Sequence, residues 1–247
     1  MDQTRNASGK RTELHMARSM CWHCQSEVTG EYFCEQCVKV QPLSKELDYF
    51  TCLGLPRLLN IDIGTLEAKF YALSRAFHPD FYQNKTDSEQ AISLGNSALL
   101  NTAYRTLKDP IQRAEYLLRL EAGSAKDIRT SPPADLFEEI LALQEDLEAY
   151  RSALSGQDPV SVGQLRARLT ADRDTLEQRQ REMETRLFDL FTKWDSLQSR
   201  QNQPGQTEAT VPRLHQEKDA VLKEMREILS NRTYLRNIIT DLAATIA

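Results

Sequence analysis

The feature that most constrains the fold of this chain is an apolar stripe that ends at a proline. Four apolar residues recur at helical spacing on one face: Leu66, Phe70, Leu73 and Phe77. They predict a half-buried helix, since an α-helix turns by about 100° per residue. Pro79 ends this helix, because proline has no backbone donor and disfavours helical geometry at the residue before it. The polar run 81–88 is expected to lie in water, and a second helix is predicted over about residues 87–108. His78 and Asp80 are therefore expected at the tip of a helical hairpin.

Two interpretations of the His78-Pro79-Asp80 tripeptide are open on these residues alone. His78 and Asp80 can simply cap the hairpin and hydrogen-bond its loop, because a helix end favours proline in any case and common tripeptides arise by chance. On the tripeptide alone this structural interpretation is the favoured one. The alternative is a functional loop, for which the flanking motifs have to decide.

Two Cys-x-x-Cys pairs precede the hairpin and predict a metal site. Its four expected ligands are Cys21, Cys24, Cys34 and Cys37. Two such pairs let four thiolates converge tetrahedrally on one ion, with Gly30 available for the turn between them. Structural zinc is the expected cofactor, because zinc accepts four thiolates without redox chemistry, although a single iron would use the same ligands. About 20 residues cannot bury a core, so the ion supplies the folding energy of this segment.

Other uses of the cysteines are less consistent with the sequence. Disulfides need an oxidising compartment, whereas the chain has five cysteines and no apolar signal segment at its start. Cys52, the odd one, stands beside Phe50 and Leu53 on a predicted short helix and is expected to be a buried, inert thiol. His23 could replace a ligand in principle, but the four-cysteine set is complete without it.

Charge and polarity limit the classes of partner. Residues 1–19 are polar and are expected to be disordered. Four basic residues there suit a mitochondrial presequence: Arg5, Lys10, Arg11 and Arg18. Asp2 and Glu13 do not suit one, which argues against import. With 31 basic and 36 acidic residues the net charge is -5, so no overall basic field points to nucleic acid. No stretch is long and apolar enough to predict a membrane span.

Three further helices are predicted after Ser131-Pro132-Pro133. The first covers about residues 134–154, and the third about 212–246. The second follows Asp158 as its cap and Pro159 as its first residue, and runs towards residue 200. The apolar stripe of the first is Leu136, Ile140, Leu143 and Leu147, and that of the third is Val221, Met225, Ile228, Leu235, Ile239 and Leu242. Because these stripes can be buried only against each other, an antiparallel three-helix bundle and an all-α fold class are predicted.

Some large apolar residues fall outside these stripes. Phe137 and Leu141 lie about 90 to 130° from the centre of the first stripe, next to Glu138 and Glu145. Tyr234 likewise falls off the third stripe. Large apolar groups rimmed by acids suggest a protein-binding patch. Packing against the first domain, or a wider core contact, would explain them equally well.

Several motifs in order resemble a known family. They are Asp48-Tyr49-Phe50, Phe77-His78-Pro79-Asp80-Phe81, Asn101-x-Ala103-Tyr104-x-Thr106-Leu107 and Arg113-Ala114-Glu115-Tyr116-Leu117-Leu118. The arrangement resembles a J domain, the module by which co-chaperones activate DnaK-type chaperones. The set as a whole resembles the HscB and Jac family of iron–sulfur co-chaperones, in its variety with an N-terminal tetracysteine module. The direct match covers roughly half of the chain.

The resemblance implies a domain organisation. It gives a metal-binding knuckle at 20–41, a J domain at 44–121, a linker at 122–133 and a scaffold-binding bundle at 134–247. Ser44 is expected to cap the first helix of the J domain.

The resemblance also implies how the J domain meets its partner. His78, Pro79 and Asp80, with Lys69 and Arg75 on the outer face of the long helix, would contact a DnaK/HscA-type chaperone. For each basic residue taken alone, a solvated surface charge is the simpler interpretation. Phe81 stands where many J domains have lysine, and Lys85 partly compensates.

The bundle would bind an IscU-type iron–sulfur scaffold. Phe137, Leu141, Glu145 and Tyr234 fall on the family's binding positions. Glu138 joins this set, although some members have methionine there. Ala142 replaces a carboxylate of other members.

The implied mechanism is that of an adaptor rather than an enzyme. The chain would present the scaffold to the chaperone, whose ATP hydrolysis traps it and promotes cluster transfer. The sequence has no nucleotide-binding glycine motif and no catalytic constellation around its four histidines. The bacterial cytoplasm is the expected compartment, or the mitochondrial matrix if the source is eukaryotic.

Three alternatives stay open. A general J-protein would bind unfolded clients instead of a folded scaffold. A zinc-ribbon nucleic-acid binder would use Lys39 and Lys45, but basic and aromatic residues are not interleaved there. A redox enzyme would use the cysteines chemically, and a closed four-cysteine site leaves no position for a substrate.

Overall fold

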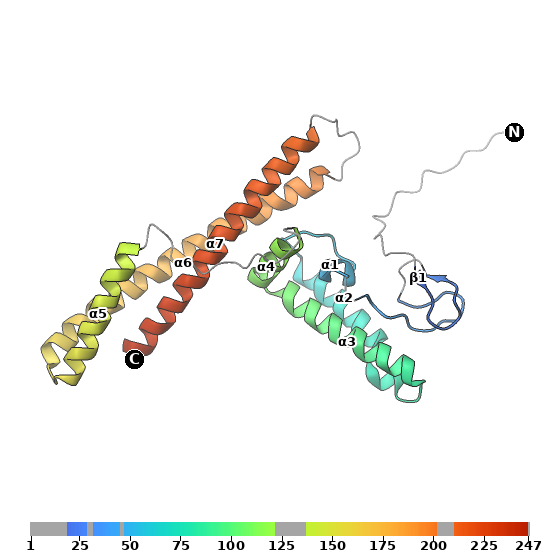
Figure 1. Cartoon of the computed structure of the whole chain (residues 1–247), viewed down its shortest axis with the longest axis horizontal. Helices are drawn as coiled ribbons and strands as arrows, with labels where there is room; N and C mark the ends of the chain where they lie inside the picture. Colours follow the sequence, from blue (N-terminus) through green and yellow to red (C-terminus); the bar gives the residue numbers. More distant parts are fainter. Residues whose placement is uncertain (1–18, 29–31, 45–46, 122–136, 202–209, 247) are drawn as a thin grey trace. The chain divides into compact units, whose positions relative to one another are not determined.

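The computed structural model describes residues 19–28, 32–44, 47–121, 137–201 and 210–246 (Figure 1). Over these ranges the chain is almost entirely helical, which confirms the all-α prediction. The helices are α1 (Tyr49–Cys52), α2 (Ile63–Ala76), α3 (Asp87–Lys108), α4 (Pro110–Glu121), α5 (Phe137–Ser155), α6 (Pro159–Gln201) and α7 (Thr210–Ile246). A short 3₁₀ turn, η1, covers Pro79–Tyr82, and two strands, β1 (Ser19–Met20) and β2 (Glu27–Val28), pair antiparallel.

The described residues form two compact units. One comprises the residues up to Arg57 together with Ile61–Pro110, and the other comprises Leu58–Asn60 with the residues from Ile111 onward. The J domain expected from the motifs ends at residue 121, so the two divisions differ in the assignment of α4. The expected tail at 1–19, apart from Ser19, and the expected linker at 122–133 lie outside the described residues.

The first unit contains the predicted hairpin of α2 and α3. Asp62 caps α2 by accepting from the Thr65 amide, and Thr86 forms a reciprocal capping box with Glu89 at the start of α3. The cap of α1 is Asp48, so the expectation that Ser44 caps this helix was wrong. An acidic side chain directly before the first helical residue reaches the free amides, and Ser44 lies too far upstream. The core of this unit includes Phe50, Leu53, Leu66, Phe77, Leu100 and Leu107, all at most 1% exposed.

A polar and aromatic contact fixes α2 against α3. The rings of Phe70 and Tyr104 stack with centroids 4.1 Å apart. The Tyr104 hydroxyl donates to Glu67 Oε1 over 3.1 Å, and Lys108 Nζ donates to the same oxygen over 3.0 Å. These contacts hold the two helices side by side and so support the loop at their tip.

One residue of the connecting loop departs from prediction. Tyr82 is 9% exposed, and its hydroxyl donates to the Ala76 carbonyl over 3.1 Å. The expectation that the whole run 81–88 lies in water was therefore wrong at this position. An aromatic ring in a polar run still gains free energy by burial when its hydroxyl finds an acceptor.

The second unit contains the predicted three-helix bundle (Figure 1). Asp158 caps α6 by accepting from the amides of Val160 and Ser161, as predicted. The buried core joins the three helices: Ile140, Leu143, Tyr150, Leu169, Leu176, Leu235, Leu242 and Ile246. Leu136 of the expected first stripe lies outside the described residues. In the same unit, the amides of Leu59 and Asn60 donate to the Asp195 carboxylate on α6, over 2.7 and 2.8 Å.

No helix in the described part of the chain combines the length and the apolar character needed to cross a membrane.

Candidate functional site

The cysteines lie on two knuckles that repeat the same backbone pattern. In the first knuckle, the Gln25 amide donates to the Cys21 carbonyl and the Cys21 amide to the Ser26 carbonyl, over 3.1 and 2.8 Å. In the second, the Val38 amide donates to the Cys34 carbonyl and the Cys34 amide to the Lys39 carbonyl, over 2.8 and 2.9 Å. Each knuckle thus turns its two thiols inward.

The four sulfur atoms lie close enough to bind one ion. All of them are within 4.8 Å of one another, and Cys21–Cys37 and Cys24–Cys34 are each separated by 3.6 Å. A tetrahedral site with metal–sulfur bonds of about 2.3 Å requires sulfur atoms about 3.8 Å apart. The donor set could therefore hold a metal ion, which confirms the predicted convergence of the four cysteines, while zinc itself stays a prediction.

Hydrogen bonds favour the thiolate form at Cys34, whereas burial raises the pKa of the Cys37 thiol to about 12. The Ser26 hydroxyl lies 3.2 Å from Cys34 Sγ, and this hydrogen bond, with smaller contributions from the backbone amides of Cys37 and Gln36, lowers the pKa of the Cys34 thiol to about 6. The Gln41 side-chain amide donates to Cys21 Sγ over 3.4 Å. Such contacts from outside the ligand set orient the ligands and delocalise their charge.

The positive φ angle of Val38 is a cost of this geometry. Gln25 and Val38, the residues that follow each pair, have φ of 63° and 58°. Left-handed geometry disfavours a β-branched side chain most. Val38 therefore stores backbone strain in an exposed position.

Neither of the other two candidates, Cys52 and His23, belongs to the four-cysteine group. Cys52 is completely buried, and burial, with a smaller contribution from the Asp48 charge, raises the pKa of its thiol to about 12. This confirms the expected buried thiol. His23 is exposed, and the metal-binding group among the described residues consists of the four cysteines.

The His78-Pro79-Asp80 turn stands exposed at the tip of the hairpin. His78 caps η1, with its Nδ1 accepting from the Asp80 amide over 3.3 Å. Its Nδ1 also lies 3.6 Å from Asp80 Oδ2, and the two side chains are 51% and 70% exposed. The capping interpretation is thus correct as geometry. It does not exclude function, because the cap leaves both side chains accessible to a partner.

The other residues predicted to contact a chaperone lie in different environments. Arg75 and Lys85 are exposed, and Phe81 is 64% exposed. Lys69 is half-buried, and its Nζ donates to the Gly54 carbonyl over 2.9 Å. Gly54 has a φ of 61° after the end of α1, so Lys69 secures this turn as well as facing the surface.

The residues predicted to bind a scaffold also differ in accessibility. Glu138 and Glu145 are exposed and Leu141 is 50% exposed, so they form one exposed face of α5. Phe137 is the first residue of α5, and its side chain lies outside the described part. Tyr234 is half-buried and packs against the bundle core, so the wider core contact explains much of its position.

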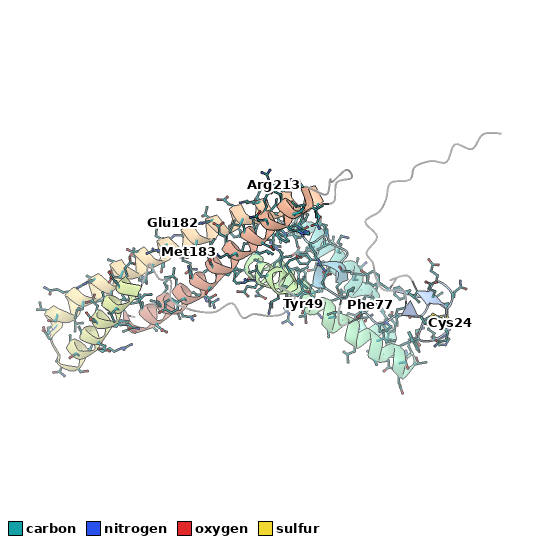
Figure 2. All side chains as sticks on the ribbon, turned by 45° about the horizontal axis from the view of Figure 1, so that its top comes forward. Cys24, Tyr49, Phe77, Glu182, Met183 and Arg213 are labelled. Carbon is teal, nitrogen blue, oxygen red and sulfur yellow. The ribbon has the colours of Figure 1, made fainter. Side chains whose placement is uncertain are left out.

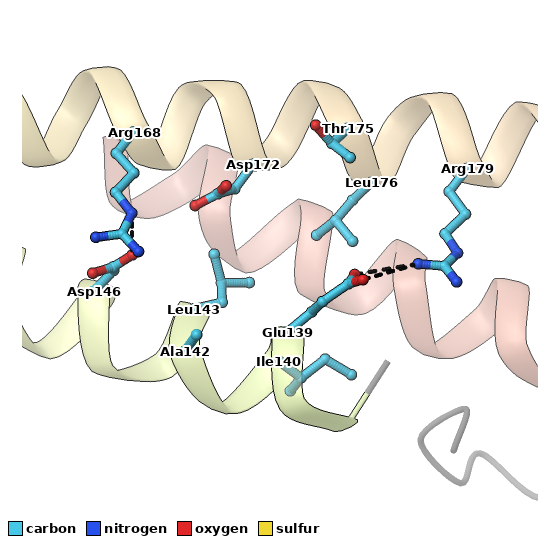
Figure 3. A pocket seen from close by; sticks show the side chains of 10 residues that line it. All are labelled: Glu139, Ile140, Ala142, Leu143, Asp146, Arg168, Asp172, Thr175, Leu176 and Arg179. Carbon is cyan, nitrogen blue, oxygen red and sulfur yellow. Dashed lines mark hydrogen bonds and ion pairs between the residues drawn. The ribbon is translucent and has the colours of Figure 1, made fainter. Parts of the chain in front are cut away.

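A groove between α5 and α6 was not predicted from the sequence (Figure 3). Two ion pairs between the helices border it, with Arg179 Nη1 3.2 Å from Glu139 Oε2 and Arg168 Nε 2.9 Å from Asp146 Oδ2. Asp172 lies between them, and burial raises the pKa of its carboxyl group. Ion pairs formed by residues this far apart in sequence leave no local pattern.

An exposed His-Pro-Asp turn on a helical hairpin, a three-helix bundle and four cysteines that could hold a metal ion together define a J-type protein with a four-cysteine module. No family model matches the chain. It is 31% identical over 149 residues to the iron-sulfur cluster co-chaperone protein HscB homolog of Arabidopsis thaliana, covering 60% of this chain and 56% of that one. It is 34% identical over 117 residues to the co-chaperone protein HscB homolog of Aliivibrio salmonicida, covering 47% of this chain and 67% of that one.

A solved structure agrees in fold. The crystal structure of human co-chaperone protein HscB superposes with a TM-score of 0.60 at 22% identity, covering 92% of this chain and 98% of that one. The chain belongs to the HscB family of co-chaperones. Its match spans about half the length of the first curated relatives, 56% of the Arabidopsis protein and 45% of the mouse protein.

Proposed function

We propose that this protein is a J-type co-chaperone of iron–sulfur cluster assembly. It binds an IscU-type scaffold and delivers it to a DnaK/HscA-type chaperone, whose ATPase it stimulates. The observation that carries the proposal is the exposed His78-Pro79-Asp80 turn in a chain of the HscB family. The chain itself is not an enzyme in this proposal, because hydrolysis takes place on the chaperone.

The hairpin tip is the proposed chaperone-binding surface. His78 and Asp80 offer a donor-acceptor pair that is already ordered by the Asp80 amide. A pre-ordered turn loses less conformational entropy on binding than a flexible loop. Arg75 on the exposed side of α2 adds a positive charge for an acidic surface of the chaperone.

The exposed face of α5 is the proposed scaffold-binding surface. Leu141 provides an apolar contact, and Glu138 and Glu145 flank it with negative charge. An apolar centre with a charged rim is the usual anatomy of a transient interface. Phe137 and Tyr234 complete the proposed set from α5 and α7.

The four-cysteine module is proposed to hold structural zinc. Cys21, Cys24, Cys34 and Cys37 would supply the closed tetrahedral site. When bound, zinc supplies folding free energy to a segment that has almost no apolar core. The bacterial cytoplasm, or the mitochondrial matrix in a eukaryote, is the proposed compartment.

The test is the steady-state ATPase of an HscA-class chaperone with and without its scaffold. The intact protein should stimulate turnover, and more strongly with scaffold present. His78→Gln should abolish stimulation, whereas His215→Gln, at an exposed position of α7, should behave as the intact protein. Equal stimulation by the two variants would overturn the proposed role of the turn.

The same assay separates a general J-protein from a scaffold-specific one. Denatured polypeptide replaces the scaffold as the client. Greater synergy with the denatured client than with the folded scaffold would favour the general J-protein.

A further inference from the structure

The four-cysteine module, predicted at residues 20–41, packs two aromatic rings against Phe77, the residue directly before His78. The Phe33 ring is stacked with the Phe77 ring, with centroids 6.0 Å apart and an interplanar angle of 24°. The Tyr32 ring meets Phe77 edge-on at 5.6 Å. Phe77 is completely buried, and it lies on the hairpin beside the module that carries Cys24 (Figure 2). The module therefore closes one side of the site that holds Phe77.

The hairpin fixes Phe77 from the other side. The hydroxyls of Ser93 and Ser97 on α3 both donate to the Phe77 carbonyl, over 2.7 and 2.9 Å. The Phe77 amide donates to the Leu73 carbonyl over 3.0 Å. The carbonyl and amide of Phe77 are both hydrogen-bonded and its ring is buried. Phe77 therefore fixes the position of the backbone that leads into His78.

The second knuckle, which carries Cys34 and Cys37, holds Tyr32 and Phe33 in place. Phe33 directly precedes the ligand Cys34, and Phe33 and Val40 form an antiparallel bridge. The backbone amide of Gln41 donates to the Tyr32 carbonyl over 2.9 Å. Since a segment with little apolar core depends on its metal to fold, the placement of both rings depends on the closed knuckle.

Two polar contacts anchor the module to α3. Lys39 Nζ lies 2.9 Å from Glu89 Oε1. Asn96 donates to the Gln41 carbonyl and accepts from the Leu43 amide, each over 2.9 Å. These contacts set the module's register on the hairpin.

We propose that the four-cysteine module positions the His78–Asp80 turn, with Tyr32 and Phe33 as the positioning residues. The order of the turn then depends on the closure of a module that is separate from it in sequence. This inference rests on the proposed function only for its activity readout, because the structural readout needs no partner.

The structural readout is hydrogen exchange at three amides bonded in or beside the turn. They are the amides of Phe77, Asp80 and Phe81, and the Phe81 amide donates to the His78 carbonyl over 3.0 Å. Phe33→Ala should speed exchange at these sites by about 2-fold to about 10-fold, the range set by the loss of one aromatic pair. Phe33→Tyr should restore slow exchange.

A matched control separates the ring contact from general damage to the module. Met20→Ala truncates an apolar side chain of the same module that is 59% exposed, and it should leave the three amides unchanged. Bound zinc, measured per chain, should be equal in Phe33→Ala and Met20→Ala. The inference would be overturned if the three amides exchanged at equal rates in Phe33→Ala and Met20→Ala.

Removal of the metal from the intact protein is the second arm, and it stands even if Phe33→Ala fails to fold. Chelation should speed exchange at the three amides by at least about 10-fold, because both rings lose their support. Amides in the core of α7 should keep their rates. Rates at Phe77, Asp80 and Phe81 that change by less than about 2-fold after complete metal removal would overturn the inference.

The activity readout distinguishes the two proposals. If the intact protein stimulates the chaperone ATPase, Phe33→Ala should lose stimulation and Phe33→Tyr should recover it. If Phe33→Ala speeds exchange but stimulates fully, the positioning role for activity is overturned. If the intact protein stimulates no DnaK/HscA-type chaperone, the proposed function fails, and the exchange data alone decide whether the module orders the turn.

Discussion

Replacing Asn96 with alanine tests the polar anchor between the metal-binding module and α3. Asn96 is 3% exposed, and its amide group bonds the Gln41 carbonyl and the Leu43 amide. The substitution leaves both backbone groups without this partner in a buried position. Each such loss costs about 1–2 kcal/mol, so the first unit should be destabilised by about 2–4 kcal/mol.

The two tryptophans allow each unit to be followed separately. Trp22 lies in the first unit and Trp194 in the second, so a Trp194→Phe background leaves Trp22 as the reporter of the first. Urea unfolding of the zinc-loaded protein would give the free-energy change. Asn101→Ala, at an exposed position of the same helix, is the control and should change stability by less than about 0.5 kcal/mol. If Asn96→Ala is no more destabilising than Asn101→Ala, the anchor contributes nothing and the reasoning is refuted.

Three further predictions concern charge and strain in the first unit. The hydrogen bond from Lys39 holds the pKa of Glu89 below its usual 4.5. The ionised Glu89 therefore stabilises the fold fully above pH 4.5, and this stabilisation is lost as the pH falls through the lowered pKa. Glu89→Gln should lower the urea midpoint at pH 7, with a smaller difference from the parent protein at pH 4; an equal difference at both would contradict this. Val38→Asn should raise stability by about 0.5–1 kcal/mol by relieving left-handed strain, and a lower midpoint for the Trp22 transition would argue against that strain. Lys69→Met should lower the free energy of unfolding by about 1 kcal/mol, because the hydrogen bond to the Gly54 carbonyl is lost. Arg75→Met should leave stability unchanged and weaken chaperone stimulation. The opposite pattern in unfolding and ATPase assays would reverse these two roles.

Local patterns in the sequence predicted the helices and several of their ends, although not the cap of α1, which is Asp48 and not Ser44. The helix expected at about 87–108 is α3 (Asp87–Lys108), and the Asp158 cap of α6 is where the pattern put it. Caps and apolar periodicity are decided by neighbours within a turn or two, so the sequence carries them directly. The paired cysteines likewise predicted the four-cysteine group that could hold a metal ion, because ligand spacing is itself a local pattern.

Contacts between distant segments could not be predicted in this way. Nothing near Lys69 in the sequence indicates its bond to the Gly54 carbonyl, and nothing near Phe77 indicates the rings of Tyr32 and Phe33. The burial of Tyr82 was not predicted, because its neighbours in the sequence are polar. Each of these contacts depends on how helices and the module meet in space, which periodicity does not encode.

The central claim is that one chain joins a scaffold to a chaperone, and separated variants test it most directly. Leu141→Lys changes the exposed face of α5 and should keep stimulation by the turn but lose the synergy with scaffold. His78→Gln should keep scaffold binding but lose stimulation. The deciding measurement is the ATPase of the chaperone with scaffold and an equal mixture of the two variants. Because both surfaces have to be on one molecule, the mixture should show no synergy beyond that of Leu141→Lys alone. Synergy restored to the level of the intact protein would contradict the account.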